Sequence, residues 1–346
     1  MEAKEIKDLL GDLKTEWQDT HDNMEKELEF YDDTFVSWKP KGFSVHRTGR
    51  GAFIINKTAD HVIVQNEVIT VPPRKDTKVE EEVADRKERF FTSLARREDA
   101  QGKEMVNKTL AKIALLFGMA VRKGPLLDET FPWRPEKGEE ELSQWLAMCR
   151  ERTPFLSSFP DPRAVFFPSD IFPPRYVIEE GKKKASYLRE KYGIELPGKK
   201  DEDSVDWVEY WTSKLRVFLA DGEKVLKEEA EENIGGFIPY GFIFSGLGID
   251  LLDIAGKRNP AKMCQGILHP YFGTLEALTR IATAIDVSTQ NFAQPQMYAK
   301  GGEATQVDWA EGPAGVTHLP PGFEFVKYDF PAVYPDMWRF YQSIEE

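Results

Sequence analysis

An alternation of apolar and polar residues from Trp207 to Val225 is the feature that most constrains the fold of this chain. The alternation has the period of two that is expected for a half-buried strand. Asp221-Gly222 interrupts it, and this dipeptide favours the two-residue turn of a β-hairpin. The segment therefore predicts antiparallel strands joined by a tight turn.

Further β signals lie on both sides of this hairpin. Pro154 to Ser169 is typical of strand, turn and strand, because the two prolines of Pro160-Asp161-Pro162-Arg163 fix a corner. Additional strands are predicted at Tyr176-Val177-Ile178 and from Ile238 to Phe244. Phe43 to Val71 also changes to a period of two, which predicts a small antiparallel meander in which His46 and His61 meet across strands as a polar pair.

Helical spacing of apolar residues alternates with these strands along the chain. It predicts a surface helix, in one or two pieces, and five others: Lys4 to Phe35, Val79 to Arg97, Gly102 to Val121, Glu139 to Arg150, Lys182 to Tyr192 and Tyr271 to Phe292. Tyr334-Pro335-Asp336 starts a last helix, which runs from Met337 to Glu346 without a C-cap, so we expect the chain to be truncated or cleaved there. The fold class predicted is α+β.

Composition excludes several classes of protein. Hydrophobic residues make up 41% and charged residues 30%, which is the balance of a globular protein, and no apolar run is long enough for a membrane span or signal peptide. We therefore expect the chain to be made and assembled in a cytoplasm. With 46 basic and 59 acidic residues the net charge is −13, which argues against a sequence-specific DNA binder.

The sequence does not contain the common catalytic or metal-binding motifs. The two cysteines, Cys149 and Cys264, are far apart and lack the spacing of a zinc site, and the five histidines contain no His-x-x-x-His pair. Gly256-Lys257 lacks the first glycine of a phosphate-binding loop, because Leu251 stands there. We therefore expect no catalytic site, no cofactor and no metal.

Three stretches of the chain, taken in order, resemble the core of one known protein family. The first runs from Pro154-Phe155 through Asp161-Pro162-Arg163-Ala164-Val165-Phe166, and it is similar to the family's strand, Asp-Pro turn and aromatic strand. The second consists of Val208-Glu209-Tyr210-Trp211, the Asp221-Gly222 turn and Gly236-Phe237-Ile238-Pro239-Tyr240, which resemble the family's sheet and the step before its stem. The third is Leu275 to Asn291 followed by Gln294 to Gly301, which resembles the helix that enters the stem and the strand that opens the clip. The family that these stretches resemble is the portal proteins of tailed bacteriophages.

The resemblance implies a portal-like α+β subunit with a mixed helix and antiparallel-sheet wing, a long stem helix and a small α/β clip. Residues 1–244 would form the wing, 245–292 a linker and the first stem helix, 293–333 the clip, and 334–346 the start of the second stem helix. Family members continue past this point through a tunnel loop, a wing helix and often a crown, so the resemblance implies a further part supplied by a longer precursor or another chain.

The function that the resemblance implies is that of a non-catalytic ring subunit at the portal vertex of a viral capsid. The ring, usually dodecameric, conducts double-stranded DNA during genome packaging and ejection and contacts terminase, a head–tail adaptor and the major capsid protein. Residues 262–346 hold ten acidic and five basic residues, a net charge of −5 that suits weak sliding contact with DNA.

Two groups of residues are predicted to carry this function. One face of the stem helix must be buried against a neighbouring copy, and it consists of Phe272, Leu275, Leu278 and Ile281. In the clip, Trp309, Phe323 and Phe325 offer apolar anchors for partners, although Phe323 and Phe325 are as well explained by a strand packed inside the subunit. Two alternatives stay open: another oligomeric virion or tail-adaptor protein without catalysis, and an enzyme whose site is assembled from scattered acids.

Overall fold

The structure is a computed structural model of the 346-residue chain. It describes residues 2–36, 38–39, 44–62, 69–75, 77–101, 105–127, 131, 135, 139–151, 155–225, 231–233, 235–254, 256–293, 297–300, 324–327, 339 and 342. The chain divides into two compact units, each described by itself below. The first comprises residues 1–31 and 52–269, and the second comprises residues 32–51 and 270–346.

The first unit holds a five-stranded antiparallel sheet in the order β3-β4-β5-β6-β7. Its strands are β3 (Val165–Phe166), β4 (Tyr176–Lys184), β5 (Ser204–Thr212), β6 (Arg216–Ala220) and β7 (Glu223–Lys224). The predicted turn joins β6 to β7, with φ angles of 47° at Asp221 and 87° at Gly222, the left-handed conformation that such turns require. The hairpin prediction is therefore confirmed.

A second antiparallel sheet of the first unit has the order β2-β1-β8. It consists of β2 (Phe155–Ser158), β1 (Met119–Leu127) and β8 (Tyr240–Phe244). The predicted strand, turn and strand from Pro154 to Ser169 corresponds to β2, a 3₁₀ turn at Pro162–Ala164 and β3. The two strands do not pair with each other, because β2 joins β1 whereas β3 joins β4.

Apart from α2 (Arg50–Val62), which is described below, six helices occur among the described residues of the first unit. They are α1 (Ala3–Tyr31), α3 (Lys78–Gln101), α4 (Val106–Phe117), α5 (Glu139–Glu151), α6 (Ala185–Tyr192) and α7 (Pro260–Met263). The first five confirm predicted helices, and Gly193 ends α6 in the left-handed conformation as expected. The exception lies at the end of α4.

The predicted helix from Gly102 to Val121 is wrong beyond Phe117, because Met119 to Val121 open β1. Gly118 ends α4 with a φ of 75°, and a Cβ there would lie 2.2 Å from the backbone nitrogen of Gln265. The apolar run continues through this glycine because both α4 and β1 are buried in the same core. A run of this kind carries no period that separates helix from strand.

The meander predicted from Phe43 to Val71 is also wrong, because α2 (Arg50–Val62) is a helix. Ile55 and Ala59 are completely buried, at the spacing of one helical turn, and this packing outweighs the strand preference of the β-branched residues. His61 lies in α2, so the predicted cross-strand pair with His46 does not form. Residues 43 and 63–68 of the predicted meander lie outside the described residues.

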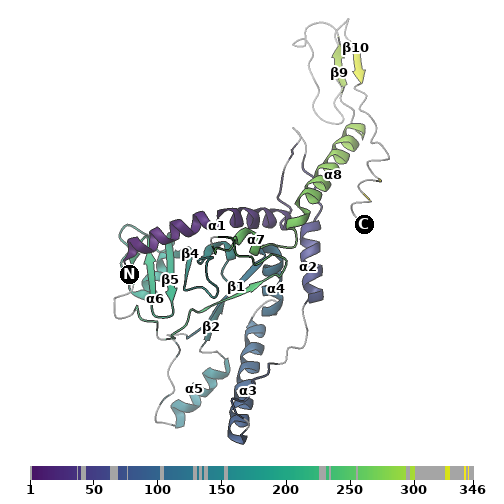
Figure 1. The fold of residues 1–346 in the computed structure, drawn as a ribbon. Helices are drawn as coiled ribbons and strands as arrows, with labels where there is room; N and C mark the ends of the chain where they lie inside the picture. Colours follow the sequence, from purple (N-terminus) through teal and green to yellow (C-terminus); the bar gives the residue numbers. More distant parts are fainter. Residues whose placement is uncertain are drawn as a thin grey trace. The chain divides into compact units, whose positions relative to one another are not determined.

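Helix α1 crosses the first unit as one continuous helix and contacts α4, α7 and β3 (Figure 1). One stripe of its side chains is buried, which confirms the predicted helical period: Ile6, Leu10, Leu13, Trp17, Met24 and Phe30. The indole of Trp17 donates a hydrogen bond of 2.9 Å to the carbonyl of Phe167, just after β3. The helix is therefore fastened to the edge of the five-stranded sheet by a polar as well as an apolar contact.

The second unit contains α8 (Phe272–Ala293), preceded by a 3₁₀ turn at His269–Tyr271. A two-stranded antiparallel ladder follows it in the chain, formed by β9 (Met297–Lys300) and β10 (Glu324–Lys327) (Figure 1). The helix predicted from Tyr271 to Phe292 is therefore confirmed. The helix predicted from Met337 to Glu346 lies outside the described residues except at positions 339 and 342, which are helical.

Candidate functional site

The four residues predicted for oligomerisation all lie on α8. Leu275 and Leu278 are buried within the single chain, whereas Phe272 and Ile281 are half-buried. The two leucines are therefore covered before any second copy binds. Phe272 and Ile281 keep surface that a neighbouring copy could cover.

Part of α8 is covered by a segment from the start of the second unit. The backbone N–H of His46 donates to the hydroxyl of Thr283, and its imidazole Nδ1 lies 2.6 Å from Oδ2 of Asp286. Thr283 and Thr279 are buried, and each donates its hydroxyl to the carbonyl four residues earlier, a pairing that lets a polar side chain sit inside a helix. His46 thus contacts α8 rather than the predicted strand partner.

The predicted clip residues can be placed only in part. Trp309 and Phe323 lie outside the described residues. Phe325 lies in β10, opposite Ala299 of β9, so the backbone is a strand at this position, and the predicted packing of its side chain inside the subunit stays a prediction. The role of all three in binding partners stays a prediction.

The first unit contains a buried ion-pair cluster formed by Lys123, Glu179 and Glu209. Glu179 on β4 and Glu209 on β5 are directly opposite in the ladder, a position where like charges repel. Lys123 enters from β1, and its ammonium lies 2.6 Å from Oε2 of each glutamate. The positive charge of Lys123 therefore offsets the repulsion between these two carboxylates, which belong to neighbouring strands of the five-stranded sheet.

Neutral donors complete this ion-pair cluster. The hydroxyl of Tyr240, on β8 opposite Lys123, donates to Oε2 of Glu179 over 2.6 Å. The indole nitrogens of Trp207 and Trp211, two positions either side of Glu209 on the same face of β5, donate to its two oxygens over 2.9 and 3.1 Å. Charged groups can be buried at low cost only when they are paired and hydrogen-bonded, and these groups meet that condition.

The electrostatics of the cluster favour its charged form. Burial acts to raise the pKa of Glu209, but the Lys123 ammonium and the two indole donors outweigh it, so the pKa lies below its ordinary value. Burial likewise acts to lower the pKa of Lys123, and the two glutamates outweigh it, so that pKa is raised. Burial and then the two carboxylates raise the pKa of Tyr240 well above its ordinary value, which keeps the phenol a donor.

The arrangement of this cluster is that of a structural contact which holds the two sheets together, and it is poorly suited to proton transfer. Lys123 and Glu209 are less than a tenth exposed, and their polar atoms are occupied by one another and by the tyrosine and tryptophans. A reacting group would need to reach an atom that is already hydrogen-bonded and covered. The sequence analysis missed the cluster, although a glutamate between two tryptophans at a spacing of two was a visible signal of a buried carboxylate.

A second buried carboxyl belongs to Glu27 of α1, which is 1% exposed. Its Oε1 accepts a hydrogen bond of 3.0 Å from the N–H of Gly266, in the loop after α7. Burial raises the pKa of Glu27 to about 8, although the hydrogen bond from Gly266 acts in the opposite direction. Burial and the charge of Glu27 also raise the pKa of the nearby Cys264 thiol, so Cys264 stays protonated and unreactive.

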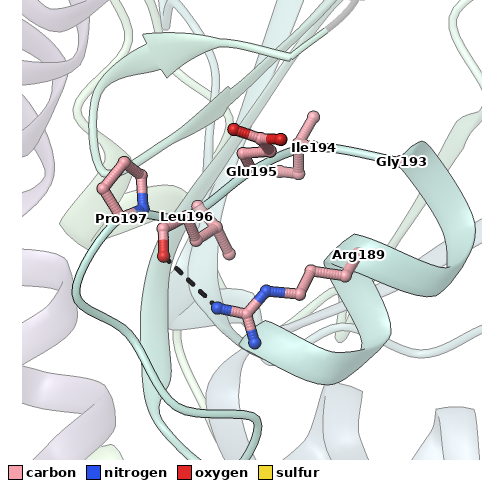
Figure 2. Close-up of a pocket in the computed structure, with 6 residues that line it drawn as sticks. All are labelled: Arg189, Gly193, Ile194, Glu195, Leu196 and Pro197. Atoms are coloured by element: carbon pink, nitrogen blue, oxygen red, sulfur yellow. Dashed lines mark hydrogen bonds between the residues drawn. The ribbon is translucent and has the colours of Figure 1, made fainter.

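A shallow pocket of about 460 Å³ lies at the end of α6 and is lined by Arg189 and by residues 193–197, which are drawn in Figure 2. Arg189 points along this pocket and donates to the carbonyls of Leu196 and Lys199 and to the carboxylate of Asp201. The guanidinium is therefore used to hold its own loop. Because Arg189 is already engaged in these contacts, the pocket does not present its guanidinium to an anionic ligand.

Comparison with known proteins adds no family. No protein-family model matches the chain, and no curated protein matches it. Within the described parts of the chain, no three His, Cys, Asp or Glu side chains gather closely enough to hold a metal ion. None of the described helices combines the length and the apolar character needed to cross a membrane.

Proposed function

We propose that this chain is a structural subunit of a viral portal ring, the channel at one vertex of a capsid through which DNA enters and leaves. The observation that carries the proposal is the order of elements from residue 155 to residue 300. A strand, an Asp-Pro turn, an antiparallel sheet with an Asp-Gly hairpin, a Gly-Phe-Ile-Pro-Tyr step, a long helix and a strand follow one another. The resemblance to portal proteins rests on the same order.

In the proposed ring, α8 is the first stem helix and the segment from residue 293 to residue 333 is the clip. A ring repeats each subunit's charge around its axis, so the net charge of −5 over residues 262–346 becomes a strong negative field if that part lines the channel. An acidic wall repels phosphates and lets DNA slide. The proposed partners are other copies of the chain, terminase, a head–tail adaptor and the major capsid protein.

The buried ion-pair cluster fits this proposal as a structural feature. A subunit that transmits load between a capsid and a packaging motor needs a rigid body, and the cluster fixes the relative position of the two sheets by directional contacts. This role requires neither a cofactor nor a catalytic group. It is compatible with the virion localisation that the portal resemblance implies.

Negative-stain electron microscopy of the purified 346-residue chain tests the proposal. We expect rings of uniform diameter with a central hole, of which many are dodecameric. Discrete oligomers without a hole would favour another virion or tail-adaptor protein. Monomers at all accessible concentrations, or ATP hydrolysis abolished by a point substitution in this chain, would overturn the proposal.

A further inference from the structure

A buried connector leads from α7 toward the end of the first unit. It consists of residues 264–268, which form neither helix nor strand, and the 3₁₀ turn that begins at His269 follows it. Cys264 is 3% exposed and Leu268 is completely buried. The second unit begins at residue 270, so the chain passes through the connector shortly before it enters that unit.

Hydrogen bonds from three sides hold the connector. They are donated by the N–H of Ile267 to the carbonyl of Leu115 in the last turn of α4 (2.8 Å), by the hydroxyl of Ser245 to the carbonyl of Gln265 (2.8 Å), and by the N–H of Gly266 to Oε1 of Glu27 on α1 (3.0 Å). The first of them satisfies a carbonyl that the end of a helix leaves without a partner. Among the three, only the contact with Glu27 involves a group that gains or loses a proton near neutral pH.

The carboxyl of Glu27 also lies close to the end of α4. A Cβ at Gly266 would lie 2.1 Å from the carbonyl oxygen of Leu116 and 2.6 Å from Oε1 of Glu27, so these two oxygens border the same glycine. The last carbonyls of a helix carry a partial negative charge. A negative charge on Glu27 is therefore disfavoured by its position as well as by its burial.

No counter-ion compensates for the burial of this carboxyl among the residues that the structure describes. Glu27 is 1% exposed, and its polar partner is the N–H of Gly266. Basic side chains on α1 itself, on α4 and α7 and at the end of the connector do not pair with it: Lys26, Lys108, Lys112, Lys262 and His269. The Cys264 thiol interacts with it from the connector and stays protonated. A carboxyl in such surroundings keeps its proton, in agreement with the pKa of about 8 that burial gives Glu27.

We propose that Glu27 is a pH-sensitive latch, which holds the connector closed while it is protonated and releases the connector when it ionises. In the open form the carboxyl reaches water and ionises as an exposed glutamate does. The closed form therefore binds a proton that the open form gives up, so the ratio of open to closed chains rises about tenfold for each pH unit from 4.5 to 8. An open connector lengthens the link between the two units, since the second unit starts at residue 270. The latch does not depend on ring assembly.

Hydrogen exchange of the 346-residue chain, followed by mass spectrometry between pH 5 and pH 8, tests the latch. After correction for the intrinsic pH dependence of exchange, the protection of the connector amides should fall about tenfold for each pH unit and stay below that of β5. Glu27→Gln keeps a hydrogen-bond acceptor without a titratable group, so the protection of its connector should not change with pH. Glu25→Gln, at an exposed neighbour on α1, should follow the wild type.

The wild-type measurement decides the proposal by itself, so the test does not depend on how well Glu27→Gln folds. A protection of the connector that stays constant with pH would overturn the latch, because Glu27 would then keep its protonation state when the connector opens. Connector amides as well protected as those of β5 at each pH would do the same, because the connector would then open only when the whole unit unfolds. An equal fall in Glu27→Gln would assign the pH dependence to another group. None of these results bears on ring formation, which microscopy tests separately.

Discussion

The ammonium of Lys123 on β1 lies 2.6 Å from the carboxylate of Glu209 on β5, so a buried ion pair connects the three-stranded sheet to the five-stranded one. Glu179 shares the same ammonium from the neighbouring strand. The contact is directional, and the surrounding core leaves the side chains of Lys123 and Glu209 only 8% exposed. Its loss would therefore leave two carboxylates facing each other without a counter-ion.

Replacing this lysine should destabilise the first unit strongly. Lys123→Met leaves Glu179 and Glu209 buried and unpaired, so we expect a loss of about 3 to 5 kcal/mol in the free energy of unfolding by urea denaturation. Lys182→Met is the matched control, because the Lys182 ammonium lies 4.0 Å from Asp206 at an exposed site. That change should stay within about 0.5 kcal/mol, and equal losses in both variants would contradict the role assigned to Lys123.

Glu27 should make the stability of the protein depend on pH. Its pKa is about 8 in the folded chain against 4.5 for the ordinary group, so unfolding releases a proton between these values. Stability should therefore fall as pH rises from 4.5 to 8, by about 1.4 kcal/mol for each pH unit from this group, and change little on either side of that window.

The variant Glu27→Gln resembles the protonated form and should remove this component. Its advantage over the wild type in melting temperature should be absent near pH 4 and grow steadily up to pH 8. Glu25→Gln, an exposed neighbour on the same helix, should follow the wild-type curve. Parallel curves for Glu27→Gln and the wild type would show that Glu27 ionises normally in the folded protein.

Gly118 should be the glycine of the first unit that tolerates substitution worst. Gly118→Ala places a Cβ at a φ of 75° and 2.2 Å from the nitrogen of Gln265, so we expect a loss of about 2 to 5 kcal/mol. Gly193 has a similar φ of 63° but open space around it, and Gly193→Ala should cost about 1 to 2 kcal/mol. Thermal melting of the two variants separates steric from conformational cost, and equal losses would count against the close approach at Gly118.

On α8, burial separates two substitutions that the sequence alone treats alike. Leu278→Asp introduces a charge at a site that is 4% exposed, so we expect insoluble or unfolded protein. Ile281→Asp changes a half-buried position and should leave a folded chain with weaker self-association, measured by light scattering after size-exclusion chromatography. If the Ile281→Asp variant assembles as the wild type does, α8 does not form a contact between copies.

The sequence predicted those elements whose local signals agree with their packing. Asp221-Gly222 specifies its turn by backbone conformation alone, and Gly193 ends its helix for the same reason, so both could be located without a structure. Residues 50–62 could not, because β-branched residues there favour a strand and only burial of Ile55 and Ala59 selects the helix. Propensity is weaker than tertiary packing at such sites.

The buried ion-pair cluster shows a different limit of prediction. Trp207, Glu209 and Trp211 reveal from their spacing that a carboxylate shares a face with two indoles. Lys123 could not be paired with them, since Met119 to Val121 at the start of β1 were expected to end a helix and nothing local indicates which strand will lie beside β1. The partner of a buried charge depends on the order of strands in space, which a single sequence encodes only through its global packing.

The strand order has a consequence for how the chain folds. Strands β4 to β7 pair with their neighbours in sequence and can form as soon as residue 224 has left the ribosome. Met119 must wait for its partner Phe244, because the pairing of β1 with β8 closes a loop that contains the whole five-stranded sheet. We therefore expect the Lys123 ammonium to be fully buried only when β8 adds Tyr240 beside it and completes the smaller sheet.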